Sequence, residues 1–266
     1  MAEYGTAGAA WRCQPMTDTA AATIPVWLHA LAIGALILGA ACAIIVINDV
    51  VQHPQRMDIM NFVWPLVALF AGPLALWAYF SYGRLATHEM AMPAMKKCED
   101  PPSKRLTPFP MMVAKGCGHC GAGCCLGDVV AEWLCFGVPA IAVWFGYRSI
   151  FQDKMFAVWI VDYIFAFSFG VVFQYFTIAP MRGLGVRDGI VAAVKADTLS
   201  LTAWQLGMYG FMALAQFLYF RPLLGKAVEM NTPEFWFTMQ LAMLAGFVTS
   251  YPINWWLIRA GVKEKM

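Results

Sequence analysis

Four of the eight cysteines and one of the four histidines lie within twelve residues of this chain, from Gly116 to Gly127. Thiolates and imidazole are the ligands that Cu(I), zinc and iron–sulfur clusters prefer, and the interspersed glycines let a backbone fold closely around an ion. If a helix has begun at Cys117, then Cys117, Cys120 and Cys124 share one face. Three sulfurs on one face suit a low-coordinate Cu(I) site at least as well as tetrahedral zinc. The predicted metal ligands are therefore His119, Cys120 and Cys124, with Cys117 assisting.

Two other interpretations of this segment stay open. Cys117 and Cys120 form a Cys-x-x-Cys pair, and a helix N-terminus would favour their thiolates, as a thiol–disulfide or electron relay requires. Nothing upstream resembles the strand of a thioredoxin unit, so such a relay would be of a membrane type. The third interpretation is packing alone, because Gly123 and Gly127 are spaced to let two helices approach closely.

Two carboxylates continue the cysteine face. Cys124, Asp128, Glu132 and Cys135 advance by four, four and three residues, which keeps them on one side of a helix. At 1.5 Å per residue Glu132 is expected about 18 Å from Cys120 along the axis, near the middle of the bilayer. A lone carboxylate there costs several kcal/mol, so this face should point into the protein.

Further carboxylates in the following spans extend the predicted polar face. Asp162 and Asp197 could join Asp128 and Glu132 in an ion or proton path. The alternative is a structural network in which Lys195 or Arg182 neutralises Asp128 and Glu132.

The composition predicts an all-α membrane protein. Of the 266 residues 61% are hydrophobic and 13% charged, whereas soluble domains carry about a quarter charged residues. The net charge of +2 is small and the basic residues of the chain are scattered, which argues against nucleic acid as a partner.

The apolar run after residue 24 is too long for the hydrophobic core of a signal peptide, so we expect it to stay attached as the first span.

Six segments are long and apolar enough to cross a bilayer as helices. They comprise residues 25–47, 59–83, 120–147, 155–180, 199–220 and 235–258. Tryptophans and tyrosines near their ends support the boundaries. Residues 186–198 are expected to form an amphipathic helix that either lies at the interface or extends the fifth span.

The Lys and Arg distribution predicts that both termini are cytoplasmic. With the N-terminus inside, thirteen of the 18 basic residues fall on the inner side, and this excess is typical of the cytoplasm. The expected organisation is a cytoplasmic segment 1–24, a six-span domain 25–258 and a basic tail 259–266. Within the domain, a long cytoplasmic loop 84–116, irregular because of its prolines, leads into the cluster 117–125.

The cluster and its surroundings resemble a known family. Residues 118–124 (Gly-His-Cys-Gly-Ala-Gly-Cys), 126–128 (Leu-Gly-Asp) and 132–133 (Glu-Trp) match the signature of a bacterial multi-pass membrane family of unknown function. Supporting stretches are 174–176, 179–182, 195–201, 221–223 and 251–255, so the resemblance runs from about Trp64 to the C-terminus. That family is sometimes associated with copper oxidases, which implies copper handling by association. Cys125 stands where Thr is more usual, so it is not expected to be a core ligand.

These observations predict a bacterial inner-membrane protein that handles or transports Cu(I), with zinc or no metal as alternatives. The expected partners are the bilayer and the metal ion, together with a second copy of the chain or a copper protein. Classical soluble-enzyme chemistry is not expected, because the chain has no GxSxG, P-loop or HExxH motif, and the question of enzyme activity stays open. The alternative functions are a thiol relay through Cys117 and Cys120, or a structural or assembly subunit of a membrane complex.

Overall fold

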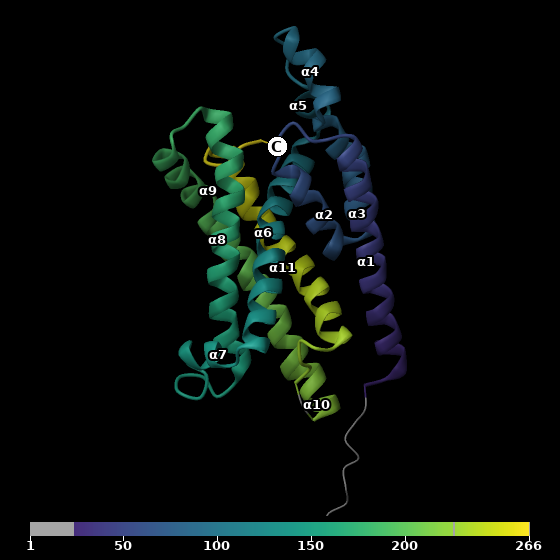
Figure 1. The fold of residues 1–266 in the computed structure, drawn as a ribbon, viewed down its shortest axis with the longest axis vertical. Helices are drawn as coiled ribbons and strands as arrows, with labels where there is room; N and C mark the ends of the chain where they lie inside the picture. The colour runs from purple at the N-terminus through teal and green to yellow at the C-terminus, as the bar shows by residue number, and fades with distance from the viewer. Residues whose placement is uncertain (1–23, 226, 266) are drawn as a thin grey trace, which may run out of the picture.

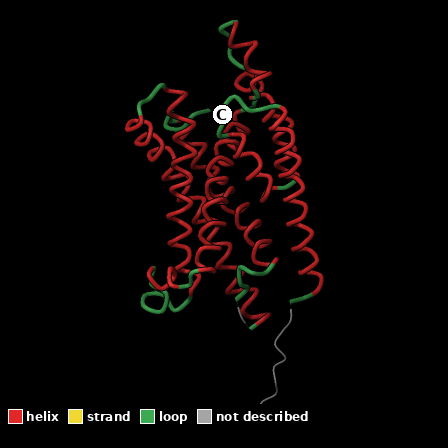
Figure 2. Tube along the Cα trace, in the orientation of Figure 1, coloured by secondary structure: helices red, strands yellow, loops and turns green. Residues whose placement is uncertain are grey.

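The protein is a helical bundle. The computed structural model describes residues 24–225 and 227–265, and every named element within them is a helix. Its long helices are α1 (Val26–Gln52), α6 (Phe109–Gly137), α8 (Lys154–Arg182), α9 (Val186–Leu214) and α11 (Pro233–Arg259) (Figure 1). Short loops link the helices at the two ends of the bundle (Figure 2). The expected cytoplasmic segment 1–24 lies outside the described residues, apart from Ile24.

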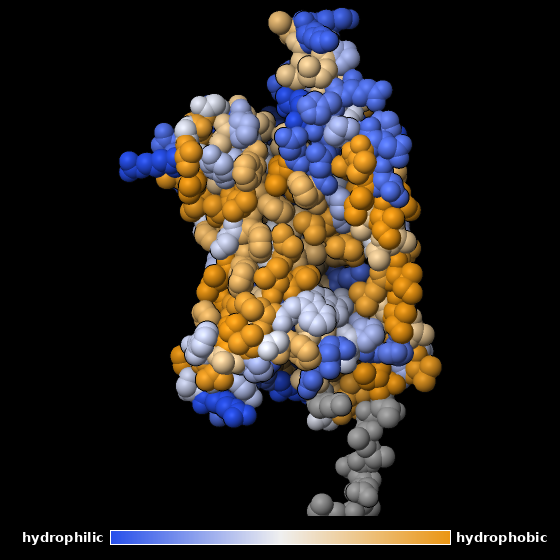
Figure 3. Space-filling model, in the orientation of Figure 1, coloured by the Kyte–Doolittle hydropathy of each residue, from blue (hydrophilic) through white to orange (hydrophobic). Residues whose placement is uncertain are grey.

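Four of these helices, α1, α6, α8 and α11, are long and apolar enough to cross a membrane. The shortest of them has 27 residues and extends about 40 Å, more than the roughly 30 Å of a hydrocarbon core. Hydrophobic side chains cover the middle of the face seen in Figure 3, and hydrophilic side chains gather at its upper end and lower rim. Helix α9 has 29 residues, as α6 and α8 do, and it packs against α8 and α11. The first half of α9 is more polar than those helices.

Helix α6 lies at the centre and is held close to its neighbours by glycine. A Cβ atom on Gly123 would lie 2.9 Å from the Cα of Gly170 in α8, and one on Gly127 would overlap the backbone of Ala166. The indole ring of Trp204 in α9 fills the space beside Gly121. The sequence-based expectation that Gly123 and Gly127 permit close helix packing is confirmed.

Helix α6 starts earlier and ends earlier than the predicted span 120–147. Pro108 is its N-cap and Pro110 lies in its first turn, where proline has no hydrogen bond to lose, so these prolines begin a helix instead of prolonging a loop. Cys120 is therefore near the middle of α6, not at its mouth. Glu132 lies near the C-terminal end of α6.

The predicted second span, 59–83, is wrong as a single crossing helix. It forms α2 (Met60–Ala71), α3 (Pro73–Ala78) and the π-helical turn η1 (Tyr79–Gly83), with a break at Gly72, which has φ +52°. A left-handed glycine followed by proline ends α2 after 12 residues, too few to span a membrane. The rings of Trp64 and Tyr79 meet at 5.4 Å, so the returning arm lies beside the entering one.

We call residues 60–83 the helical hairpin. The backbone groups at its tip, around Gly72, have hydrogen-bond partners. Ala75 and Leu76 donate their N–H groups to the carbonyl of Gly72. The Gln240 side chain of α11 donates its Nε2–H to the carbonyl of Leu69 at 2.7 Å. Irregular backbone inside a membrane protein is stable only where such partners replace water.

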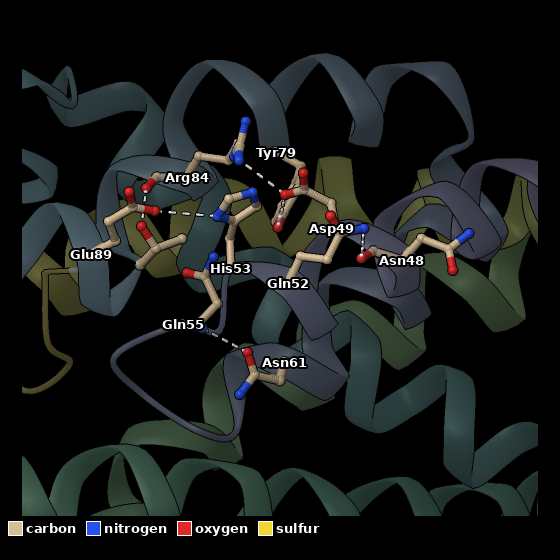
Figure 4. Close-up of polar contacts among 10 residues, drawn as sticks. Asn48, Asp49, Gln52, His53, Gln55, Asn61, Tyr79, Arg84 and Glu89 are labelled. Carbon is tan, nitrogen blue, oxygen red and sulfur yellow. Dashed lines mark hydrogen bonds and ion pairs between the residues drawn. The ribbon is translucent and has the colours of Figure 1, made fainter.

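Polar contacts close the base of the hairpin near the end of α1 (Figure 4). The Asp49 carboxylate accepts a hydrogen bond from the Tyr79 hydroxyl at 2.7 Å and lies 3.3 Å from Nε of Arg84. His53 and Glu89 approach to 3.3 Å beside them. These contacts join the end of the returning arm and the start of α4 to the C-terminal end of α1.

Because the hairpin returns to the end that it entered, α1 begins and α11 ends at opposite ends of the bundle (Figure 1). The expectation of six spans with both termini on one side therefore does not hold for the described residues. The loop 84–116 also contains more structure than expected. It holds the turn η2 (Arg84–Ala86), α4 (His88–Lys96), α5 (Pro102–Leu106) and the start of α6.

The last helical pieces lie at the lower end of the bundle. They are α7 (Ala140–Trp144), the π-helical turn η3 (Ala215–Phe220), and α10 (Arg221–Leu224). The amphipathic segment 186–198 extends the fifth span as one continuous helix, α9, which was one of the two expectations for it.

Replacing Gly127 with Ala should destabilise the protein by about 1–3 kcal/mol, because the added methyl group overlaps the backbone of α8. A matched control is Gly210→Ala in α9, where no atom lies within 4 Å of the new Cβ. That change should be neutral or stabilise by about 0.5–1 kcal/mol. Thermal unfolding of both variants in detergent measures the difference, and equal melting temperatures would contradict the packing described for α6.

Candidate functional site

Cys120 is the centre of a buried polar cluster between α6, α9 and the end of α11. Its side chain is fully buried. The Sγ atom lies 2.8 Å from Oδ1 of Asp197, to which the thiol donates, and 3.0 Å from Oγ of Ser200. It also lies 2.9 Å from the ammonium nitrogen of Lys263. We call Cys120, Asp197, Ser200, Asn254 and Lys263 the thiol–lysine cluster.

Lys263 reaches this cluster because the chain turns back after α11. Helix α11 ends at Arg259, and Gly261 adopts φ +73°, the left-handed conformation that glycine tolerates best. The N–H groups of Val262 and Lys263 then bond to the carbonyl of Leu257 at 3.1 and 3.2 Å. This turn directs the Lys263 side chain inward, where it is 2% exposed, instead of leaving it in a basic surface tail as expected.

Several acceptors share the charge of the Lys263 ammonium. Besides Cys120, it donates to Oδ1 of Asn254 at 2.7 Å and to the carbonyl of Gly116 at 3.2 Å. Burial acts to lower the pKa of Lys263, but Cys120 and Asp197 raise it, and the net shift of the pKa is upward. Lys263 is therefore a buried cation that donates hydrogen bonds to a thiol and an amide, and the nearby Asp197 carboxylate attracts it electrostatically.

The predicted metal ligands point in different directions. His119 points away from the thiol–lysine cluster toward α8, where its Nε2 lies 2.9 Å from Oγ1 of Thr177. Cys117 faces α11 and lies near Asn254 and Lys263. Among the described residues, no three His, Cys, Asp or Glu side chains lie together in a way that could hold a metal ion. The structure therefore separates His119 from Cys120, and it adds Asp197 to the surroundings of Cys120.

Asp128, Glu132 and Asp162 form a second buried group, which we call the carboxyl cluster. All three side chains are buried, and they lie close enough to interact electrostatically. The only hydrogen bond to Asp128 from a described side chain comes from Nε2 of Gln205 at 3.4 Å, and neither oxygen of Asp162 has a described partner. The expectation that this face of α6 points into the bundle is confirmed.

The two clusters lie along one line through the bundle. Cys124 lies on the face of α6 between them and interacts electrostatically with Cys120 and Asp197 on one side and Asp128 on the other. The cation next to Glu132 is Lys154, at the start of α8. Ionisable groups thus follow α6 from the buried Lys263 to the half-buried Lys154, and we call this series the polar file.

The alternative in which Lys195 or Arg182 neutralises Asp128 and Glu132 is wrong. Lys195 is exposed on α9. Arg182 lies at the far end of α8, where its Nε atom pairs with Glu264 at 2.6 Å. No ammonium or guanidinium of the described chain forms a hydrogen bond or ion pair with Asp128, Glu132 or Asp162, so charge balance at the carboxyl cluster calls for bound protons or a cation.

Sequence reasoning missed two members of the thiol–lysine cluster. Ser200 follows Asp197 by three residues, so helical spacing could have placed it on the same face. Lys263 had a weaker signal, a glycine two residues earlier that allows the chain to reverse at the end of a helix.

Residues 111–263 match a family described as a domain of unknown function, DUF4396. The match covers more than half of the chain and contains the whole polar file. The chain belongs to the DUF4396 family. The expectation of a family of unknown function is thus confirmed, over a shorter stretch than the one expected from Trp64 onward. No curated protein and no solved structure matches the chain.

Within the DUF4396 region, replacing Lys263 with Met should destabilise the protein by about 3–5 kcal/mol, because Asp197 and Cys120 lose their buried counter-charge. The double variant Lys263→Met/Asp197→Asn should recover part of that loss, since it removes the unpaired carboxylate as well. Lys265→Met is the control, because Lys265 is exposed, and it should change stability by less than about 0.5 kcal/mol. Equal melting temperatures for Lys263→Met and Lys265→Met would contradict a paired buried lysine.

Proposed function

We propose that this DUF4396 protein is an integral membrane protein that handles a soft monovalent cation, Cu(I), which binds at Cys120 and moves along the polar file. The observation that carries this proposal is the Lys263 ammonium, a cation already held inside the bundle by a thiol, a carboxylate and an amide. A site that stabilises one positive charge in the protein interior is suited to exchange that charge for another.

Sulfur chemistry favours Cu(I) as the second cation. Cys120 and Cys117 lie one turn apart on α6, and both lie near the Lys263 ammonium. Cu(I) prefers thiolate ligands at low coordination number and carries the same charge as an ammonium. In this proposal, metal and lysine exclude each other. Lys263 balances the charge of Asp197 and donates to the Cys120 sulfur in the metal-free state, and it moves away when Cu(I) binds in place of the thiol proton. His119 would then support the site from the α8 side of the helix instead of acting as a direct ligand.

The carboxyl cluster supplies the rest of the proposed route. Asp128, Glu132 and Asp162 are buried with few hydrogen-bond donors, as is typical of groups that bind and release protons or cations inside membrane proteins. We propose that they pass the ion, or a compensating proton, between Cys124 and the lower end of the bundle.

Charge distribution supports an orientation. In the described chain thirteen Lys and Arg residues lie in the upper half of the bundle, where α1 and α11 end, and three lie at the lower end. The lower three are Arg148, Lys154 and Arg221. Since the cytoplasmic side holds the excess of basic residues, we propose that the upper end faces the cytoplasm of a bacterial cell. Thiol relay and assembly functions remain predictions.

Cu(I) binding tests the proposal directly. Purified protein, titrated with Cu(I) against a chromophoric chelator, should bind one ion per chain, and Cys120→Ser should lower the affinity at least about tenfold. Lys263→Met should raise the affinity and should gain more thermal stability from Cu(I) than the wild type does, because the metal replaces the missing charge.

The matched control is Cys42→Ser, which removes a buried free thiol of α1 far along the chain from the cluster. It should bind Cu(I) like the wild type. Equal affinities for the wild type, Cys120→Ser and Lys263→Met would sink the proposal.

The carboxyl cluster should affect movement of the ion and not its initial capture. In proteoliposomes, Asp128→Asn and Glu132→Gln should slow Cu(I) flux at least about tenfold while leaving Cu(I) affinity in detergent unchanged. Asp188→Asn, an exposed change in the first turn of α9, serves as the control and should leave flux unaltered. If both variants transport Cu(I) at the wild-type rate, the carboxyl cluster does not take part in movement of the ion.

A further inference from the structure

Two cavities of opposite character meet beside the helical hairpin. The first is an apolar cavity of about 220 Å³, enclosed by the hairpin, by the start of α6 and by Leu244 and Phe247 of α11. The second is a polar cavity of about 730 Å³ at the upper end, between the hairpin base, α5 and the chain after α11. Met60, Trp64 and Lys115 line both of them.

Lys115 stands at the boundary of the two cavities. Its side chain is 5% exposed, and no hydrogen bond or ion pair joins its ammonium to any described residue. A nearly buried ammonium without a partner is costly, whereas one beside an anion is stable. Its aliphatic stem contacts the apolar cavity, so the side chain links a hydrophobic compartment to a charged one.

The polar cavity carries spare positive charge. Of its acidic residues, Asp100 is paired with Lys104 at 2.8 Å and Glu264 with Arg182 at 2.6 Å. Lys115 and Lys265 have no acidic partner among the described residues, and one acidic residue of the lining, Glu99, is in no ion pair there. An anionic group would therefore complement this lining.

We propose that the two cavities together bind one phospholipid with an anionic headgroup. An acyl chain occupies the apolar cavity between the hairpin and α6, and the phosphate lies against Lys115 in the polar cavity. An apolar cavity of roughly 150 Å³ is large enough for a benzene ring, so one of 220 Å³ accepts a segment of an acyl chain. Basic pockets between membrane helices are suited to lipid phosphates because they combine charge with adjoining apolar surface. This site uses neither Cys120 nor Cu(I), although Lys263 of the thiol–lysine cluster also lines the polar cavity.

The test compares two lipids with the same acyl chains on the full-length protein. Native mass spectrometry and thermal shifts in detergent should show that dioleoylphosphatidylglycerol binds about tenfold more tightly than dioleoylphosphatidylcholine, because only the first leaves a net negative charge for Lys115. Lys115→Met should abolish this preference while keeping the apolar stem. Lys97→Met, an exposed lysine of neither cavity, should preserve it.

A second variant tests the apolar cavity without altering Lys115. Ala114→Phe places a ring into that cavity and should reduce the binding of both lipids. Equal binding of the two lipids by the wild type, or a preference that survives Lys115→Met, would overturn the proposal. Inorganic phosphate is the third probe: stabilisation by phosphate equal to that by phosphatidylglycerol would assign the site to a soluble anion and would also overturn it.

Discussion

The contact of the Lys263 ammonium with Cys120, beside the Asp197 carboxylate, is the interaction on which the centre of this bundle depends. A buried ammonium needs acceptors from several directions, and here α6, α9 and α11 supply one or more each. The three helices must therefore converge at this level, and the chain must reverse at Gly261 to bring the lysine in. Burial strengthens every attraction in the cluster, but it makes the loss of any one member costly.

The cysteine-rich segment performs two structural tasks on two sides of one helix. Its glycines bring α6 close to α8 and make room for the Trp204 ring, so water and lipid are excluded. Its thiols face the dry interior that this packing creates. Metal binding and close packing, which compete as explanations of the sequence, are therefore compatible in the fold, because the low-dielectric surroundings of Cys120 result from the glycines beside it.

The sequence was sufficient to predict the helical class, the presence of helices long and apolar enough to cross a membrane, three of the long helices within a few residues, and the inward face that carries Cys120, Asp128 and Glu132. It was misleading at residues 59–83, because an apolar stretch of that length has the same hydropathy whether it crosses a membrane or folds back on itself. Gly72 and Pro73 were the only local signs that the helix breaks. Pro108 and Pro110 were taken as breakers, although proline also begins helices. Lys263 was missed because Cys120 and Ser200, two of its partners, lie more than sixty residues away in sequence.

The contact between Gln240 and Leu69 has a consequence for biosynthesis. Each arm of the hairpin is shorter than the roughly 20 residues that the insertion machinery recognises as a span. The carbonyl at its tip receives its donor from a residue 171 positions later, on the last helix to be made. Until α11 has been made, the Leu69 carbonyl at the tip lacks this donor. The hairpin therefore gains this hydrogen bond late in synthesis, although it follows α1 directly in the chain.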